Sequence, residues 1–189
     1  ITTGDNNVAV GFEALKTLAT SSQNTAVGHT ALKFNTAANN SAFGYGALAA
    51  NSSGTANLAV GRSALAANTT GDNNTAVGKS ALTANTTADN NTAVGQNALN
   101  VNTTGAANVA VGKSALQANT TASSNVAFGQ DALLTNTTGS YNTALGYEAL
   151  RLATTASNNT AVGRQALAAN TTGANNTAVG ALAGDAITT

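Results

Sequence analysis

The sequence lacks four residue types altogether and carries few charges. It contains no Cys, Pro, Met or Trp. Without Cys, the chain has no disulfides and no thiolate metal sites. Charged residues make up 7% of the sequence, against about 25% in typical soluble domains, and the formal net charge is zero. Such a chain has no basic field with which to neutralise phosphates, so we expect no nucleic-acid partner.

Long apolar runs are also missing, and chemistry-bearing residues are sparse. No stretch approaches the roughly 20 apolar residues that span a bilayer, so we expect no membrane insertion. The single histidine, His29, has no partner at a recurring spacing and is expected at the surface. The acidic residues form no regular array. We therefore expect no enzymatic activity, no metal and no cofactor.

One 17-residue repeat fills the chain. The string "NNTAVG" occurs at 73–78, 90–95, 158–163 and 175–180, with close variants elsewhere. The glycines that end these strings lie 17 residues apart, except for one gap of 16 between Gly28 and Gly44. The consensus is NTAVGxxALxxNTTGxN. A fixed short period predicts a solenoid or an array, so we treat 1–189 as a single continuous repeat domain.

The repeat favours extended structure over helix. Gly recurs in every unit, Thr and Asn are poor in helix interiors, and no 3.6-residue apolar stripe runs through the chain. "NTAVG" predicts a short strand and "SALTANTT" a second, weaker one, while Gly and Asn supply the corners. The predicted fold is an all-β parallel β-solenoid, or β-roll, of about eleven coils. Stacked about 4.8 Å apart, they give a rod of roughly 50 Å.

Asparagine stands four residues before the repeat glycine in every unit. In a solenoid each of these side chains lies above its own copy, and stacked amides can donate and accept along the axis. A turn-capping Asn with a left-handed backbone is the alternative interpretation. The predicted ladder comprises Asn7, Asn24, Asn40, Asn57, Asn74, Asn91, Asn108, Asn125, Asn142, Asn159 and Asn176. We expect the residue missing from the short coil to come from an outer loop at 35–40, where deletion is tolerated.

Alanine stands two residues before the glycine in every unit. Strand side chains alternate between faces, so if Val77 and Leu82 fill the interior, Ala76 points outward. A constant small residue on an outer face suggests a closely packed partner, and a homotrimer is the simplest one; the alternative is that Ala points inward. The possible interface comprises Ala9, Ala26, Ala42, Ala59, Ala76, Ala93, Ala110, Ala127, Ala144, Ala161 and Ala178.

The residues one and two after the glycine vary most. We expect these side chains to face solvent and to supply any contact with a cell-surface receptor or glycan. They are Phe12, His29, Tyr45, Arg62, Lys79, Gln96, Lys113, Gln130, Tyr147 and Arg164.

"NTAVGKSALTANTTGDNNTAVG" resembles repeats of bacteriophage tail fibres and bacterial surface fibres. Its "NTAVG" part is similar to the "SVAIG" repeat of YadA-type trimeric autotransporter heads. The resemblance implies a left-handed, trimeric β-roll, an extracellular location on a cell or virion surface, and a role as a structural or adhesive fibre segment. The inserted "ALxxNTTG" departs from the autotransporter pattern, which leaves coil shape and handedness open.

We also consider two alternative functions and one mode of assembly for this repeat: an ice-binding protein, a carbohydrate enzyme and an end-to-end filament. Regular Thr and Asn ranks could order water, as in an ice-binding solenoid, although neighbouring Thr of "TT" would leave only one rank outward. A β-helical carbohydrate enzyme would need clustered carboxylates, which the repeat lacks. The chain begins with Ile1 rather than Met and both ends read "ITT". We therefore expect a segment of a longer solenoid, or a filament of copies stacked end to end.

Overall fold

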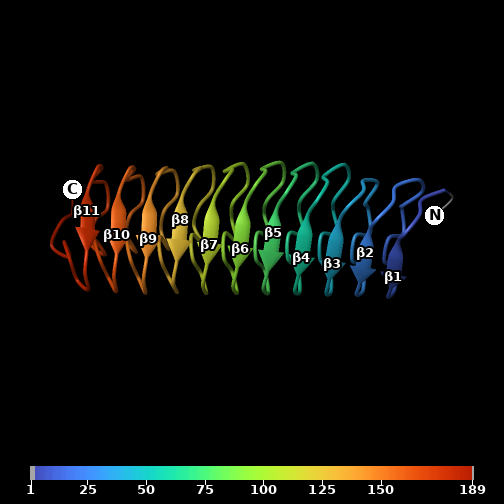
Figure 1. Ribbon diagram of the computed structural model, residues 1–189, viewed down its shortest axis with the longest axis horizontal. Helices are drawn as coiled ribbons and strands as arrows, with labels where there is room; N and C mark the ends of the chain where they lie inside the picture. The colour runs from blue at the N-terminus through green and yellow to red at the C-terminus, as the bar shows by residue number, and fades with distance from the viewer. Residues whose placement is uncertain (1–2, 189) are drawn as a thin grey trace.

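The computed structural model describes residues 3–188 and forms one parallel sheet of eleven three-residue strands. Sheet order follows chain order, so each coil adds one strand beside the previous one (Figure 1). The predicted parallel β-solenoid is confirmed. The strands are β1 (Val8–Val10), β2 (Thr25–Val27), β3 (Ser41–Phe43), β4 (Leu58–Val60), β5 (Thr75–Val77), β6 (Thr92–Val94), β7 (Val109–Val111), β8 (Val126–Phe128), β9 (Thr143–Leu145), β10 (Thr160–Val162) and β11 (Thr177–Val179).

The strand register places each residue beside its own copy in the next coil. Between β5 and β6, for example, Ala76 pairs with Ala93 and Val77 with Val94. The same pairing holds across the 16-residue coil, between β2 and β3. Neighbouring strands lie about 4.8 Å apart, so ten steps from β1 to β11 give a rod of about 48 Å.

The interior is lined by leucine and alanine. Ala76, Ala81 and Leu82 are 0% exposed and belong to one apolar cluster that runs along the rod. Val77 lies on the outer face and is half-buried. The inward orientation of Leu82 is therefore confirmed, whereas the inward Val77 and outward Ala76 are wrong. The leucine from the facing turn fills the space in front of the strand, so only a methyl group fits at the strand's central position.

The expected second strand over "SALTANTT" does not form. Residues 79–84 make a turn in which Ser80 and Leu82 have φ of 58° and 51°. The backbone N–H of Asn85 donates to the Leu82 carbonyl at 3.2 Å and closes the turn. The backbone N–H of Leu82 donates to the Ala98 carbonyl at 3.0 Å and joins the turn to the next coil. A left-handed leucine costs about 1–2 kcal/mol, and complete burial of its side chain offsets that cost.

The glycine after each strand allows the coils to approach closely. Gly78 has φ of +140°, and a Cβ there would lie 2.5 Å from the carbonyl oxygen of Gly95 in the next coil. A side chain at this position would meet both backbone strain and a backbone clash. The repeat therefore keeps glycine here.

Candidate functional site

The predicted asparagine ladder lies inside the rod. Asn74 donates its backbone N–H and its Nδ2 to Asn57 Oδ1, at 2.9 and 3.2 Å, and Nδ2 also donates to the Ala88 carbonyl at 2.8 Å. The equivalent amides from Asn24 to Asn159 are almost completely buried, whereas Asn7 and Asn176 at the two ends are half-buried. Each amide oxygen thus joins one coil to the next.

A second asparagine ladder runs parallel to the first, and the sequence reasoning missed it. Asn85 Nδ2 donates to Asn68 Oδ1 at 2.9 Å and to the Ala88 carbonyl at 3.0 Å. Both ladders therefore donate to the same carbonyl and hold the loop between them. The signal was present in the fixed spacing of "NTT". The members, all 0% exposed, are Asn35, Asn51, Asn68, Asn85, Asn102, Asn119, Asn136 and Asn170.

The repeat has two irregularities, a coil of 16 residues and an alanine at position 153, and they affect the asparagine ladders differently. In the 16-residue coil, Asn51 Nδ2 still reaches Asn35 Oδ1 at 2.7 Å, and the Asn40 N–H reaches Asn24 Oδ1 at 3.0 Å. The missing residue therefore lies in the loop between Asn35 and Asn40, as predicted. At Ala153, by contrast, an alanine interrupts the second ladder.

The predicted alanine interface is wrong. Strand alanines face the interior of their own coil, where they meet the apolar cluster, so they cannot contact another chain. Ala9 in β1 is exposed and Ala178 is 9% exposed. The fully buried alanines are Ala26, Ala42, Ala59, Ala76, Ala93, Ala110, Ala127, Ala144 and Ala161.

The ten residues that follow the repeat glycines form a straight, exposed column. We call Phe12, His29, Tyr45, Arg62, Lys79, Gln96, Lys113, Gln130, Tyr147 and Arg164 the post-glycine column; every member is exposed, as predicted. Their backbone is fixed coil by coil: the Asn97 N–H donates to the Lys79 carbonyl at 3.0 Å, and the Ser114 N–H to the Gln96 carbonyl at 2.9 Å. The fold thus presents changing side chains along one fixed line.

The N-terminal end of this column is an aromatic stack. His29 lies between Phe12 and Tyr45, with ring centroids 5.1 and 4.9 Å away and small interplanar angles. Each ring covers the face of its neighbour, so the stack presents ring edges to solvent. His29 is at the surface as expected, but its stacking follows from coil spacing and was not predicted.

A charged cluster lies beside this stack. Glu13 accepts from Lys16 at 2.5 Å and pairs with Lys33 at 2.7 Å. Hydrogen bonding from Lys16 and then from Lys33 lowers the pKa of Glu13 to about 2. A carboxylate that holds its proton so weakly is unsuited to donate one near neutral pH.

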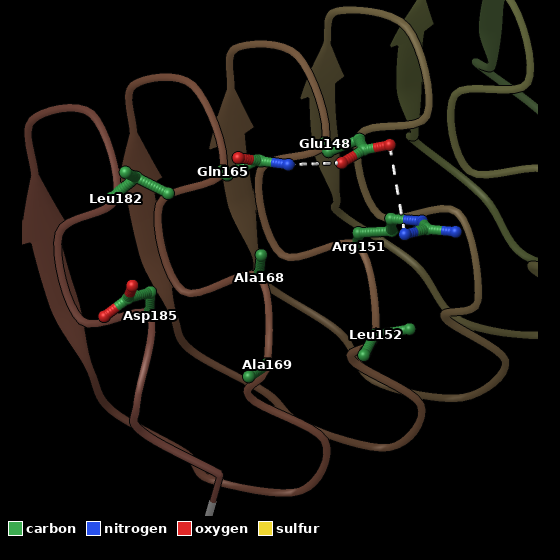
Figure 2. Close-up of a pocket in the computed structure, with 8 residues that line it drawn as sticks. All are labelled: Glu148, Arg151, Leu152, Gln165, Ala168, Ala169, Leu182 and Asp185. Atoms are coloured by element: carbon green, nitrogen blue, oxygen red, sulfur yellow. Dashed lines mark hydrogen bonds and ion pairs between the residues drawn. The ribbon is translucent and has the colours of Figure 1, made fainter.

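A hollow of about 260 Å³ lies beside the other end of the column (Figure 2). Gln165 Nε2 donates to Glu148 Oε2 at 2.7 Å, and Arg151 Nη1 lies 3.9 Å from Glu148 Oε1. The hydrogen bond from Gln165 lowers the pKa of Glu148, and Glu148 in turn raises the pKa of the neighbouring Tyr147. Leu152, Ala168, Ala169, Leu182 and Asp185 complete the lining.

The hollow presents both charged and apolar side chains. The Glu148 carboxylate is held ionised by its neighbours, and the hollow is open to solvent (Figure 2). Within residues 3–188, no group of three or more His, Asp or Glu side chains could hold a metal ion. Across the same residues, no helix is long and apolar enough to cross a membrane. Comparisons with protein-family models, curated proteins and solved structures find no match to the chain.

Proposed function

We propose that the chain is a segment of an extracellular structural or adhesive fibre, on a cell or virion surface, whose rod presents the post-glycine column to a receptor or glycan. The observation that carries the proposal is the separation of constant and variable positions. In the coils between the two ends of the rod, the ladder asparagine, the strand alanine and the turn leucine are constant and buried, whereas the exposed column changes in nearly every coil. Such a division suits a scaffold whose shape is fixed and whose surface can vary.

Electron microscopy of the purified chain and immunogold labelling of the producing cells or particles test this proposal together. We expect rods at least 48 Å long and labelling at the outer surface. Compact particles without a long axis, or labelling confined to the cell interior, would contradict it.

We propose lateral self-association, as in a homotrimer, from the outer face of the sheet, and end-to-end stacking from the unpaired edges of β1 and β11. With the alanines buried, the exposed apolar residues of the strands include Val10, Phe43, Phe128, Leu145 and Val179. Half-buried valines at the same position of the other coils continue this apolar line between them, and exposed apolar patches mark interaction surfaces. Light scattering of the parent and of a Phe43→Ser, Phe128→Ser variant tests the proposal: a parent that is monomeric at all concentrations would remove it.

Ice binding is the second candidate, and one observation favours it. The first Thr of each "TT" pair is half-buried and donates to the next coil, as Thr69 does to the Thr86 carbonyl at 3.0 Å. The second Thr is exposed and forms a regular rank that can order water, although a single rank is a narrower surface than two adjacent ranks would be. Its members are Thr70, Thr87, Thr104, Thr121, Thr138, Thr155 and Thr172. Thermal hysteresis with shaped ice crystals would support this function, and an unchanged freezing point would exclude it.

A further inference from the structure

The basic residues of the chain are unevenly distributed around the rod. Four of the seven Lys and Arg side chains belong to the post-glycine column: Arg62, Lys79, Lys113 and Arg164. The column contains no Asp or Glu. A chain with zero formal net charge therefore carries one basic line along its length.

The three basic residues outside the column are already paired. Lys16 and Lys33 share Glu13, and Arg151 lies beside Glu148. By contrast, no ion pair within residues 3–188 engages Arg62, Lys79 or Lys113, and all three are exposed. The cations at the centre of the rod are thus free to meet an anion.

The acidic residues of the same coils are engaged elsewhere. Asp72 Oδ1 accepts the Thr55 N–H at 2.6 Å, and Asp89 Oδ1 accepts the Asp72 N–H at 2.7 Å. Both carboxylates lie in the loops between the two asparagine ladders, at a different part of each coil from the column. Beside Arg62, Lys79, Gln96 and Lys113, the next residue is neutral: Ser63, Ser80, Asn97 and Ser114. The neutral stretch ends at the following coil, where Gln130 Nε2 donates to Asp131 Oδ2 at 3.1 Å.

The spacing of the cations suits a linear polymer. One coil advances about 4.8 Å, so the backbones of Arg62 and Lys79 are about 5 Å apart and those of Lys79 and Lys113 about 10 Å. A pyranose chain advances by a similar length with each sugar ring. Gln96, between Lys79 and Lys113, can donate and accept hydrogen bonds with sugar hydroxyls.

We propose that Arg62, Lys79, Gln96 and Lys113 bind a linear acidic polysaccharide that lies along the rod. This inference rests on the proposed adhesive function and specifies its ligand. Nucleic acid fits less well, for two reasons. Duplex DNA carries one phosphate charge for about every 1.7 Å of its axis, which is much denser than cations spaced about 5 and 10 Å apart along the rod. The rings of Phe12, His29 and Tyr45 already stack on one another and offer bases little free platform.

Affinity electrophoresis and calorimetry with alginate oligomers test the proposal, with dextran and oligo-dT as comparison polymers. The test variant carries Arg62→Gln, Lys79→Gln and Lys113→Gln. The control carries Lys16→Gln, Lys33→Gln and Arg151→Gln, and so loses the same charge from outside the column. We expect the test variant to bind alginate about tenfold more weakly and the control to bind within about twofold of the parent.

Equal losses in both variants would mean attraction by overall charge and would overturn the site. Oligo-dT binding as tight as alginate binding would replace the polysaccharide with nucleic acid, and dextran binding as tight would remove the role of the cations. Failure of the parent to bind alginate would also overturn the inference. Because the microscopy and surface labelling do not depend on alginate, such a failure would be distinguishable from failure of the fibre proposal. Circular dichroism melts of both variants verify that they are folded.

Discussion

Replacing Ala153 with asparagine should stabilise the rod, because it repairs the break in the second ladder. Ala153 lies 17 residues after Asn136 and 17 before Asn170, and is itself completely buried. Asn136 Oδ1 is the one buried side-chain polar atom without a hydrogen-bond partner in the described part of the chain. In the regular coils, the equivalent oxygen accepts from the next asparagine, as Asn102 Oδ1 does from Asn119 Nδ2 at 2.8 Å.

The magnitude follows from the neighbours of the new amide. Its Nδ2 would donate to Asn136 Oδ1 and to the Ala156 carbonyl, and its Oδ1 would accept from Asn170 Nδ2. Satisfying a buried acceptor recovers about 1–3 kcal/mol, and a further net hydrogen bond adds about 1 kcal/mol. Ordering the side chain costs about 1 kcal/mol. The net gain is about 2 kcal/mol, and at about 2–4 °C per kcal/mol for a chain of this length the melting midpoint should rise by about 4–8 °C.

Thermal and urea melts followed by circular dichroism measure the effect. Asn119→Ala, which makes the same break in an intact part of the ladder, should lower the midpoint. Ala168→Asn adds an amide at a half-buried position outside the ladder and should change little. An Ala153→Asn midpoint equal to or below that of the parent would refute the account of the ladder as a source of stability.

Three further predictions follow from the same coils. Gly95→Ala should destabilise the chain by about 2 kcal/mol or more, because its φ is +138° and its Cβ would meet the next coil's backbone at 2.4 Å. A Cβ at Gly71 would approach the Ala88 carbonyl oxygen equally closely, but φ there is not in the left-handed region and other coils carry alanine at this position. Gly71→Ala should therefore cost less in the same urea melts. Leu116→Asp should place an unpaired charge in the core and lower the midpoint strongly; a midpoint within about one degree of the parent would contradict its burial. Because the pKa of Glu13 is lowered to about 2, chiefly by Lys16, its contribution to stability is present above its unfolded pKa of about 4.3 and is lost as the pH falls towards 2. NMR titration should show this depressed midpoint, and an ordinary midpoint would exclude the cluster.

Much of the fold could be predicted because the period itself carries the information. A constant Asn74 at 17-residue spacing requires stacked coils, and the strand around Ala76 follows from "NTAVG". The turn at Leu82 could not be predicted, since propensity argues against a left-handed leucine. The second ladder at Asn85 was visible in the spacing of "NTT", but the same residues also fit polar turns, and only the burial of the amide separates the two.

The orientation of Ala76 shows where constancy is ambiguous. A residue that never varies is in close contact with something, but in a solenoid that neighbour can be the next coil as well as another chain. The decisive quantity is the space inside the coil, which Leu82 occupies from the opposite side. That space depends on the left-handed turn conformation at Leu82, which the sequence pattern does not reveal.

The two exposed surfaces of the rod, the outer face of the sheet and the post-glycine column, differ in the kind of partner they can accept. The last residue of each strand, on the outer face of the sheet, is Val, Phe or Leu. A rigid partner packed along this face must therefore accommodate the larger rings of Phe43 and Phe128. The post-glycine column imposes no such fit, because its long side chains are exposed and a flexible polymer can adjust to each of them. Variation from Arg62 to Gln96 to Tyr147 would therefore change which polymer binds and how tightly, while the buried ladders keep the spacing of the column unchanged.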